Sequence, residues 1–250
     1  MNDPQPSTTN AMPAGPPRLH DIALYFDPIS PYAYLAFERL PEALMGLSVR
    51  VRYKPVLFAG LLKAHGQRGP AEIAPKRDWT YRHVGWLAQH HGVPLDLPAA
   101  HPFNPLALLR LALACTTDDA PGECNRYVAE QVFRHVWHGG QDPNEPARLA
   151  ALEELLQDHM MQRQKPWLVP DSEAIKQRLR TNTEDALALG LFGVPSMVVK
   201  GRIFWGLDGL PMLRDFLDGG AWFESGAWEA AAALPVGVQR VQGNQDPTKG

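Results

Sequence analysis

The alternation of hydrophobic and polar residues predicts a strand, a helix and a strand near the start of the chain. Residues 21–26 (DIALYF) form a short apolar run typical of a buried strand, and residues 47–55 (LSVRVRYKP) alternate as a second strand. Residues 31–44 have a helical pattern between them, with Pro31 at the first position, where a missing N–H costs nothing. Because the three elements are so close in sequence, we expect the strands to pair in parallel through a right-handed crossover.

From about Gly60 to Gly190 the pattern is helical and contains no convincing strand. The predicted helices span residues 80–93, 104–115, 146–161 and 171–190, and Val128, Val132 and Val136 mark a further one. The helix that starts near Asn104 is apolar on nearly all sides, with Asn104 as N-cap and Pro105 at its first position. We expect this helix to be buried.

Strands return near the C-terminal end. Residues 195–200 (PSMVVK) and 202–205 (RIFW) are joined by Gly201, which predicts a tight antiparallel hairpin. Residues 208–217 follow as a final helix capped by Asp208. The order β-α-β, long helical insertion, α-β-β-α predicts an α/β protein with a thioredoxin-like core.

This order divides the chain into four parts. The thioredoxin-like core is expected at residues 18–56 and 173–220, with the all-helical insertion at 57–172. Residues 1–17 are rich in proline and are expected to form a disordered leader, and residues 221–250 form a C-terminal tail with little fold information.

Composition adds mainly exclusions. The 250 residues are 45% hydrophobic and 20% charged with a net charge of -3, which gives no reason to expect binding to nucleic acid or a membrane surface. No apolar run approaches the roughly 18 residues of a membrane span, and the N-terminal segment lacks the apolar centre of a secretory signal. Cys115 and Cys124 are not in a C-x-x-C pair, so we expect buried thiols and a cytoplasmic setting.

The turn before the first helix holds the main candidate for chemistry, Ser30 in "DPISPYAY". A residue in this position faces unpaired N–H groups and the positive end of the helix dipole, which stabilise a thiolate. The serine hydroxyl cannot perform redox chemistry, but it can donate a hydrogen bond to the thiolate of a cofactor such as glutathione. Serine is also favoured as an N-cap for its own sake, so a purely structural role is the alternative.

A second candidate is "FGVPS", in which Pro195 opens a strand after Gly193 and Val194. X–Pro bonds are where cis peptides occur, so we expect Val194–Pro195 to be cis. In a thioredoxin-like core this loop lies beside the start of the first helix. The backbone of Val194 can then pair with an extended peptide, and glutathione is a peptide. A plain structural turn is the alternative.

Four segments together resemble a known family: "YFDPISPYAYLA", "KPVLFAGLLKAHGQRGPAEIAPKRDW", "FGVPSMVV" and "RIFWGLDGL". They are similar to the 2-hydroxychromene-2-carboxylate isomerases, relatives of the kappa-class glutathione transferases and the DsbA-type oxidoreductases. The resemblance covers roughly residues 20 to 220 and implies a core and insertion of the DsbA and kappa-class type. It also implies that Ser30 contacts the glutathione sulfur, Val194 and the adjoining Pro195 meet the cysteinyl unit, Asp208 holds the γ-glutamyl end and Lys76 lies near the site.

Two positions depart from the family pattern. Gln67 stands where the family usually has asparagine, and Gly209 stands where it often has arginine. Both positions would contact polar groups of glutathione. A changed cofactor pose, a weaker affinity or a different substrate subgroup therefore stays open.

The resemblance implies a glutathione-dependent cis–trans isomerase of an aromatic ring-fission product, acting by reversible thiolate addition. The partner would be a small aromatic carboxylate, of the 2-hydroxychromene-2-carboxylate type, with Lys76 on its carboxylate, Arg77 in reserve and Tyr32 beside it. The alternatives are a kappa-like glutathione transferase or peroxidase, and a non-enzymatic protein that binds a peptide or another partner. Relatives in this family are often dimers, so we expect a homodimer.

The remaining histidines and aromatic residues give weaker signals. His135 and His138, and the adjacent His90 and His91, have no carboxylate or thiol at a spacing that completes a metal site, so we expect no metal. A group of aromatic residues is expected in the core, with some of them walling an aromatic pocket between core and insertion. These residues are Tyr32, Tyr34, Trp79, Trp86 and Trp205.

Overall fold

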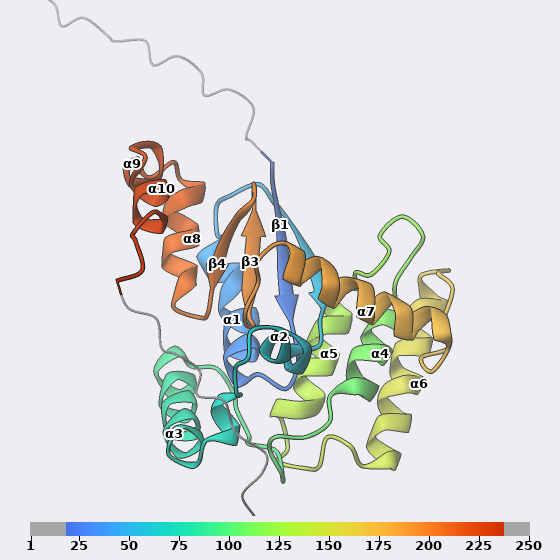
Figure 1. Cartoon of the computed structure of the whole chain (residues 1–250). Helices are drawn as coiled ribbons and strands as arrows, with labels where there is room; N and C mark the ends of the chain where they lie inside the picture. Colours follow the sequence, from blue (N-terminus) through green and yellow to red (C-terminus); the bar gives the residue numbers. More distant parts are fainter. Residues whose placement is uncertain (1–18, 238–250) are drawn as a thin grey trace, which may run out of the picture.

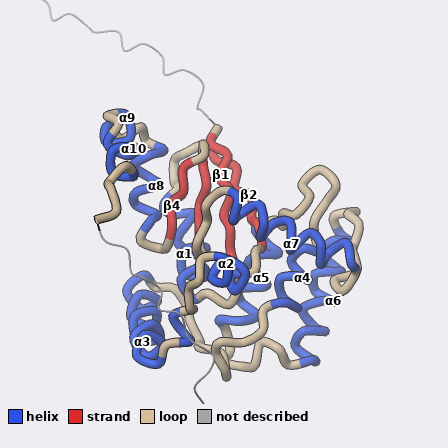
Figure 2. The backbone as a smooth tube through the Cα atoms, viewed as in Figure 1, coloured by secondary structure: helices blue, strands red, loops and turns tan. Residues whose placement is uncertain are grey.

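The computed structural model describes residues 19–237 and has a four-stranded mixed sheet at its centre, in the order β2-β1-β3-β4 (Figures 1 and 2). Strand β1 (His20–Phe26) pairs in parallel with β2 (Val49–Pro55) and antiparallel with β3 (Ser196–Val199). Strand β3 pairs antiparallel with β4 (Arg202–Trp205). The predicted parallel pair and the predicted hairpin are both confirmed.

Ten α-helices surround this sheet within the described part of the chain. They are α1 (Pro31–Ala43), α2 (Phe58–Ala64), α3 (Ala74–His91), α4 (Leu106–Ala114), α5 (Arg126–Trp137), α6 (Pro146–Gln162), α7 (Glu173–Ala188), α8 (Gly209–Leu217), α9 (Ala221–Glu224) and α10 (Ala227–Ala232), with a 3-10 turn at Pro70–Glu72. This order matches the predicted thioredoxin-like core interrupted by helices. The predicted residue boundaries of core and insertion stay a prediction, and the predicted leader lies outside the described residues.

Strand β1 is apolar because both of its faces are covered. Ile22, Leu24 and Phe26 alternate onto the larger core, which they share with buried residues of α1, α5 and α8. Ala23 and Tyr25 point the other way, into a smaller cluster that includes residues of α2 and α7. In Figure 1, α2 and α7 accordingly lie in front of the sheet and α1 lies behind it.

The helices of the insertion separate into two groups (Figure 1). Helices α4, α5 and α6 pack against one another, and the predicted valine repeat of α5 is fully buried there. Helix α3 lies apart from them on the other side of the molecule, beneath α8. It packs against the 3-10 turn and touches α1, and its Val84 and Ala88 are buried in the main core.

Several local predictions need correction. Helix α4 begins at Leu106, one residue later than predicted, although Oδ1 of Asn104 does accept a bond from the Leu106 N–H as a cap would. Helix α3 begins at Ala74, six residues before the predicted start, and α2 was not predicted. The tail was expected to carry little fold, but Phe223 is buried and packs beside Phe216. Aromatic residues therefore anchor a segment whose composition is otherwise small and polar.

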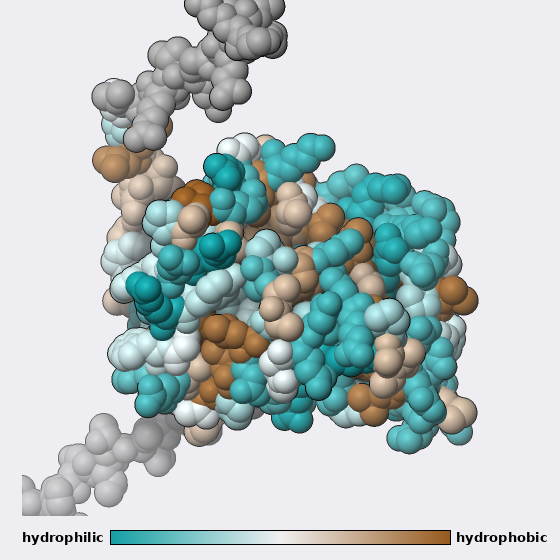
Figure 3. Space-filling view, turned by 90° about the horizontal axis from the view of Figure 1, so that it is seen from below, coloured by the Kyte–Doolittle hydropathy of each residue, from teal (hydrophilic) through white to brown (hydrophobic). Residues whose placement is uncertain are grey.

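The face of the molecule seen from below is mostly hydrophilic, with a hydrophobic patch surrounded by polar side chains (Figure 3). None of the described helices is long and apolar enough to cross a bilayer.

Candidate functional site

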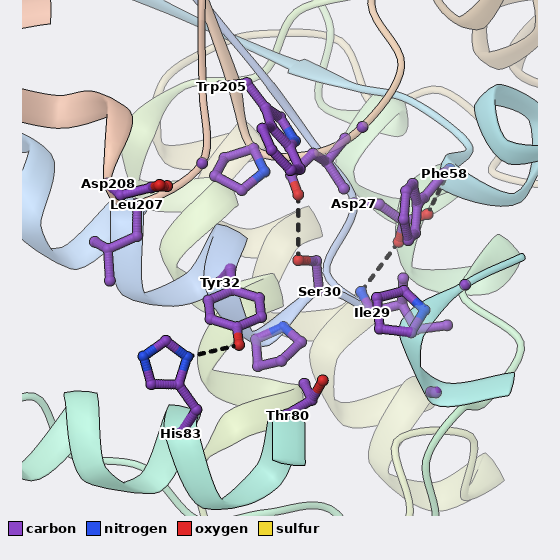
Figure 4. Close-up of a pocket in the computed structure, with 18 of the residues that line it drawn as sticks. Asp27, Ile29, Ser30, Tyr32, Phe58, Thr80, His83, Trp205, Leu207 and Asp208 are labelled. Carbon is purple, nitrogen blue, oxygen red and sulfur yellow. Dashed lines mark hydrogen bonds between the residues drawn. The ribbon is translucent and has the colours of Figure 1, made fainter. Parts of the chain in front are cut away.

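Ser30 occupies the sharp turn between β1 and α1 and is nearly buried (Figure 4). Its Oγ accepts a hydrogen bond from the Ala33 N–H at 3.2 Å, so the serine does cap α1. The same hydroxyl donates to the Val194 carbonyl at 3.5 Å, which is at the long limit for a hydrogen bond. Capping uses only the acceptor side of the hydroxyl, so its proton is weakly held and can turn to a ligand.

Asp27 fixes the turn that carries Ser30, and sequence reasoning missed it. Its carboxylate is fully buried, with Oδ1 accepting from the Ile29 N–H at 3.0 Å and Oδ2 accepting from the Phe58 N–H at 2.9 Å. Burial raises the pKa of Asp27 to about 7, although the two N–H groups oppose part of that shift. Asp27 therefore ties the serine turn to the start of α2 and titrates close to neutral pH.

His101 supports the same turn from another side and was also missed. Its Nε2 lies 2.7 Å from the Ile29 carbonyl, which can only accept, so Nε2 carries the proton. Nδ1 is then free to accept from the Tyr81 hydroxyl at 2.8 Å. Burial lowers the pKa of His101, and the bond to Ile29 partly offsets this, so the neutral ring is favoured.

The loop of Val194 and Pro195 lies directly beside Ser30, at one wall of the cavity. Their peptide bond is cis, as predicted. A β-carbon at Gly193 would lie 2.7 Å from Nε1 of Trp205, so glycine leaves the space in which the indole packs. The indole of Trp205 also packs against Phe192, with ring centroids 5.0 Å apart, so the loop is held under an aromatic cover.

One cavity of about 1330 Å³ opens over these elements. Nearly all predicted site residues line it: Ser30, Tyr32, Gln67, Lys76, Val194, Pro195 and Asp208. Arg77 does not line it, and its guanidinium instead lies 3.9 Å from the carboxylate of Asp78. Gly209, the second departure from the family pattern, is buried against the backbone of Phe204 and is not among the lining residues.

Tyr32 lies in the first turn of α1, and its hydroxyl meets α3 (Figure 4). The oxygen is 3.0 Å from Nδ1 of His83 and also bonds to Thr80. Burial raises the pKa of Tyr32, the Thr80 bond lowers it in part, and the charge of Asp208 raises it further. The phenol therefore keeps its proton at neutral pH and can donate it. The spacing of Lys76, Thr80 and His83 on one helix face was the signal that could have revealed the last two.

Charged and polar groups line the cavity at either side of Ser30. Asp208 precedes α8, but its side chain makes no capping hydrogen bond, so the predicted capping role is wrong. Its exposed carboxylate lines the cavity instead, as do the exposed side chains of Lys76 and Gln67. A ligand with both an ammonium and carboxylate groups, such as a thiol peptide, can use these groups together with the positive end of α1.

The other aromatic residues are more exposed than expected. Trp79 and Trp86 on α3 are 64% and 57% exposed, so placing them in the core was wrong, and Trp79 lines the cavity. Trp205 is also half-exposed at the cavity, whereas Tyr34 is fully buried. The exposed indoles of Trp79 and Trp205 are therefore available to a ligand in the cavity.

The cysteines and histidines have structural surroundings. Cys115 and Cys124 are buried and free, and burial raises the pKa of the Cys115 thiol to about 12, so it is inert. His135 bonds to the Pro143 carbonyl and His138 to the Tyr34 hydroxyl. Across residues 19–237, no three metal-ligating side chains gather in one place.

A family model of the DsbA-like thioredoxin domain matches residues 21–218, which is most of the chain. The chain belongs to the DsbA-like thioredoxin family. The fold and the resemblance inferred from sequence are thereby confirmed. Unlike a dithiol oxidoreductase, this DsbA-like domain has a serine, and no cysteine, at the start of its first helix.

Named relatives of the DsbA-like domain fall into two groups. It is 28% identical over 210 residues to glutathione S-transferase kappa 2 of Caenorhabditis elegans, covering 78% of this chain and 91% of the relative. It is also 28% identical over 201 residues to 2-hydroxychromene-2-carboxylate isomerase of Pseudomonas putida, covering 77% of this chain and 92% of the relative. The solved structure of a 2-hydroxychromene-2-carboxylate isomerase superposes with a TM-score of 0.66 at 24% identity, covering 83% of this chain and 98% of that one, which supports the fold.

Proposed function

We propose that this DsbA-like protein is a glutathione-dependent cis–trans isomerase of a conjugated aromatic keto acid. The observation that carries the proposal is the Ser30 hydroxyl, whose acceptor side caps α1 while its proton is only weakly held by Val194. Relatives named as isomerases and as glutathione transferases support a glutathione enzyme. These relatives support a glutathione-linked enzyme whichever of the two reactions it catalyses.

The first task of such a site is to ionise the glutathione thiol. An ordinary thiol has a pKa near 8.5, so only a small fraction is thiolate at neutral pH. A helix terminus can contribute up to about 2 kcal/mol, or roughly 1.5 pKa units, and Ser30 adds a charge-assisted hydrogen bond. Together these two effects are large enough to lower the pKa of the glutathione thiol to near neutral pH. The backbone at Val194 and Pro195, the Gln67 amide and the Asp208 carboxylate would hold the peptide.

The second task is bond rotation. In 2-hydroxychromene-2-carboxylate the ring C–O bond of the hemiketal first breaks, and the proton of its hydroxyl passes to the phenol oxygen to give the cis keto acid. The thiolate then adds to the β-carbon of this conjugated keto acid, forming a C–S bond, and the π electrons move to the carbonyl oxygen to give an enolate. The former double bond is now single and rotates freely. Collapse of the enolate expels the thiolate and restores the alkene in the trans form, so glutathione is returned. Tyr32 lines the cavity and keeps its proton, and turning its hydroxyl from His83 makes it our candidate donor to the enolate oxygen.

The substrate carboxylate requires a cation. Lys76 lines the cavity and Arg77 does not, so we assign this role to Lys76. The two free, buried cysteines fit a reducing compartment such as the cytoplasm. A homodimer stays a prediction.

A kappa-like glutathione transferase is the second candidate, because its named relative is as similar in sequence as the isomerase. The same thiolate would then attack an electrophile without being expelled. The two reactions differ in stoichiometry: isomerisation returns all glutathione, whereas transfer consumes one glutathione per turnover.

The test is to incubate the enzyme with 2-hydroxychromene-2-carboxylate and a tenfold smaller amount of glutathione. We expect many equivalents of the trans product per glutathione, with the free thiol unchanged at the end. Accumulation of a glutathione conjugate would assign the protein as a transferase. Conversion at an equal rate without glutathione would reject both reactions.

A further inference from the structure

The cavity continues well beyond Ser30, along the groove between α3 and the core. On α3 its lining residues include Thr80, His83, Leu87 and His91, which recur at spacings of three and four. This spacing places them in one stripe on one face of the helix. The eleven steps from Thr80 to His91 span about 16 Å at 1.5 Å per residue.

Two other helices present matching stripes to the same cavity. Helix α1 contributes Arg39 and Ala43, and α8 contributes Leu210 and Arg214. The two helices meet where the Arg214 guanidinium donates to the Ala43 carbonyl at 3.2 Å. We call the region lined by Arg39, Ala43, Leu87, His91, Leu210 and Arg214 the distal arm.

The distal arm is apolar on its walls, and its charges are already paired. Leu87, Leu210 and Ala43 supply the apolar surface. At the outer rim, Arg39 pairs with Glu42 and Arg214 pairs with Asp218. Such a surface offers no unpaired charge to a second ionic group, and it does not suit the polar backbone of glutathione.

The size of the cavity also exceeds what the proposed reaction needs. Ligand pockets usually measure about 300–1,000 Å³, whereas this cavity measures about 1330 Å³. Ser30 lies at the start of α1, whereas Arg39 and Ala43 lie near its end and Leu87 and His91 lie beyond Thr80 on α3. Glutathione held at Ser30 and Val194 would therefore leave the arm unfilled. The arm is continuous with the position where an electrophile must meet the thiolate.

We propose that the distal arm is a binding subsite for an elongated apolar substituent of the electrophile, so that the preferred substrate is a conjugated keto acid with a hydrophobic extension. This inference rests on the proposed function, because it places the reacting carbon at Ser30. The apolar extension lies along Leu87 and Leu210, and its end reaches the rim at Arg39. A bicyclic acid without an extension still reacts but leaves the arm empty.

The probes are cis-benzylidenepyruvates that carry a hydrogen, butyl, hexyl or octyl group at the para position. Binding is followed by quenching of tryptophan fluorescence, since Trp79 and Trp205 line the cavity, and turnover is measured separately. Burial of one methylene contributes about fourfold in affinity, so we expect Kd to fall by up to that factor per added methylene. A Kd that does not change with chain length would overturn the inference.

The variants separate the arm from the reaction. Leu87→Trp fills the arm, and Leu155→Trp is the matched control, because Leu155 is exposed on α6 and does not line the cavity. We expect Leu87→Trp to remove the dependence on chain length while leaving turnover of the unsubstituted probe within about twofold. Leu155→Trp should behave as wild type.

Leu87 touches the main core, so Ala43→Leu serves as a second, smaller obstruction at the edge of the arm. It should shorten the longest chain that still gains affinity. Equal gains in wild type and in both arm variants would overturn the inference. A dependence of Kd on chain length without any turnover would instead reject the proposed function and keep the subsite.

Discussion

The buried carboxyl of Asp27 should make the protein less stable as the pH rises through neutrality. In the folded state burial raises its pKa from the ordinary 3.8 to about 7. The folded protein therefore binds the Asp27 proton more tightly than the unfolded chain does between these values. The stability that this group contributes is fully present below about pH 3.8 and is lost as the pH rises through about 7.

The size of the effect follows from the two pKa values. Each unit corresponds to about 1.4 kcal/mol, so complete ionisation costs about 4 kcal/mol of unfolding free energy. Between pH 5 and pH 8 the loss is about 2.5 kcal/mol, because the unfolded carboxyl is already ionised at pH 5 while the folded one is still protonated. Set against a typical total of about 5–15 kcal/mol, this is a large share.

The assay is urea unfolding of wild type and Asp27→Asn at pH 5, 6, 7 and 8. Asparagine cannot titrate. It also lacks one of the two acceptors for the Ile29 and Phe58 N–H groups, so the variant should have a smaller unfolding free energy than wild type at pH 5. As the pH rises, the wild type should lose about 2.5 kcal/mol relative to the variant. Parallel pH dependence of the two proteins would refute the assignment. The titration of histidines such as His101 changes the stability of both proteins equally, so it cancels in the difference between them.

Substitutions of three cavity residues, with two control variants, test the site directly. Ser30→Ala should lower turnover by about 10- to 150-fold with little change in glutathione affinity, because a charge-assisted bond of about 1.5–3 kcal/mol acts on the thiolate. Ser30→Thr keeps the hydroxyl and should recover most of the lost turnover. Equal losses in both variants would contradict this. Lys76→Ala should raise KM for the acid by up to about fivefold, the most an exposed ion pair supplies, and the adjacent Arg77→Ala should not. Tyr32→Phe should lower kcat by about tenfold or more while Kd stays constant, and an unchanged kcat would remove Tyr32 from the reaction.

Residues whose role is fixed by local backbone structure could be predicted from the sequence. The position of Ser30 is indicated by the end of an apolar strand followed by a proline, and that of Pro195 by a glycine-rich turn before a strand. Both signals depend only on immediate neighbours. The order of strands and helices was predictable for the same reason, since each strand and each long helix has its own period.

Residues whose role depends on distant packing could not be predicted. Asp27 and His101 matter because burial isolates them and because each bonds to the backbone of the serine turn from a different element. Trp79 and Trp86 looked like core residues, but they lie on the face of α3 opposite Val84 and Ala88, which are the residues that pack into the core. Hydrophobicity alone cannot show which apolar residues of a helix lie on its buried face.

The most direct test of the central claim is the ionisation of the glutathione thiol when it is bound beside Ser30. The measurement is the thiolate absorbance of the wild-type complex as a function of pH, compared with free glutathione and with the Ser30→Ala complex. The account predicts a thiol pKa lowered by about 1.5 units in the wild-type complex and a smaller shift in the variant. A bound thiol that titrates like free glutathione, or glutathione that does not bind at all, would contradict it.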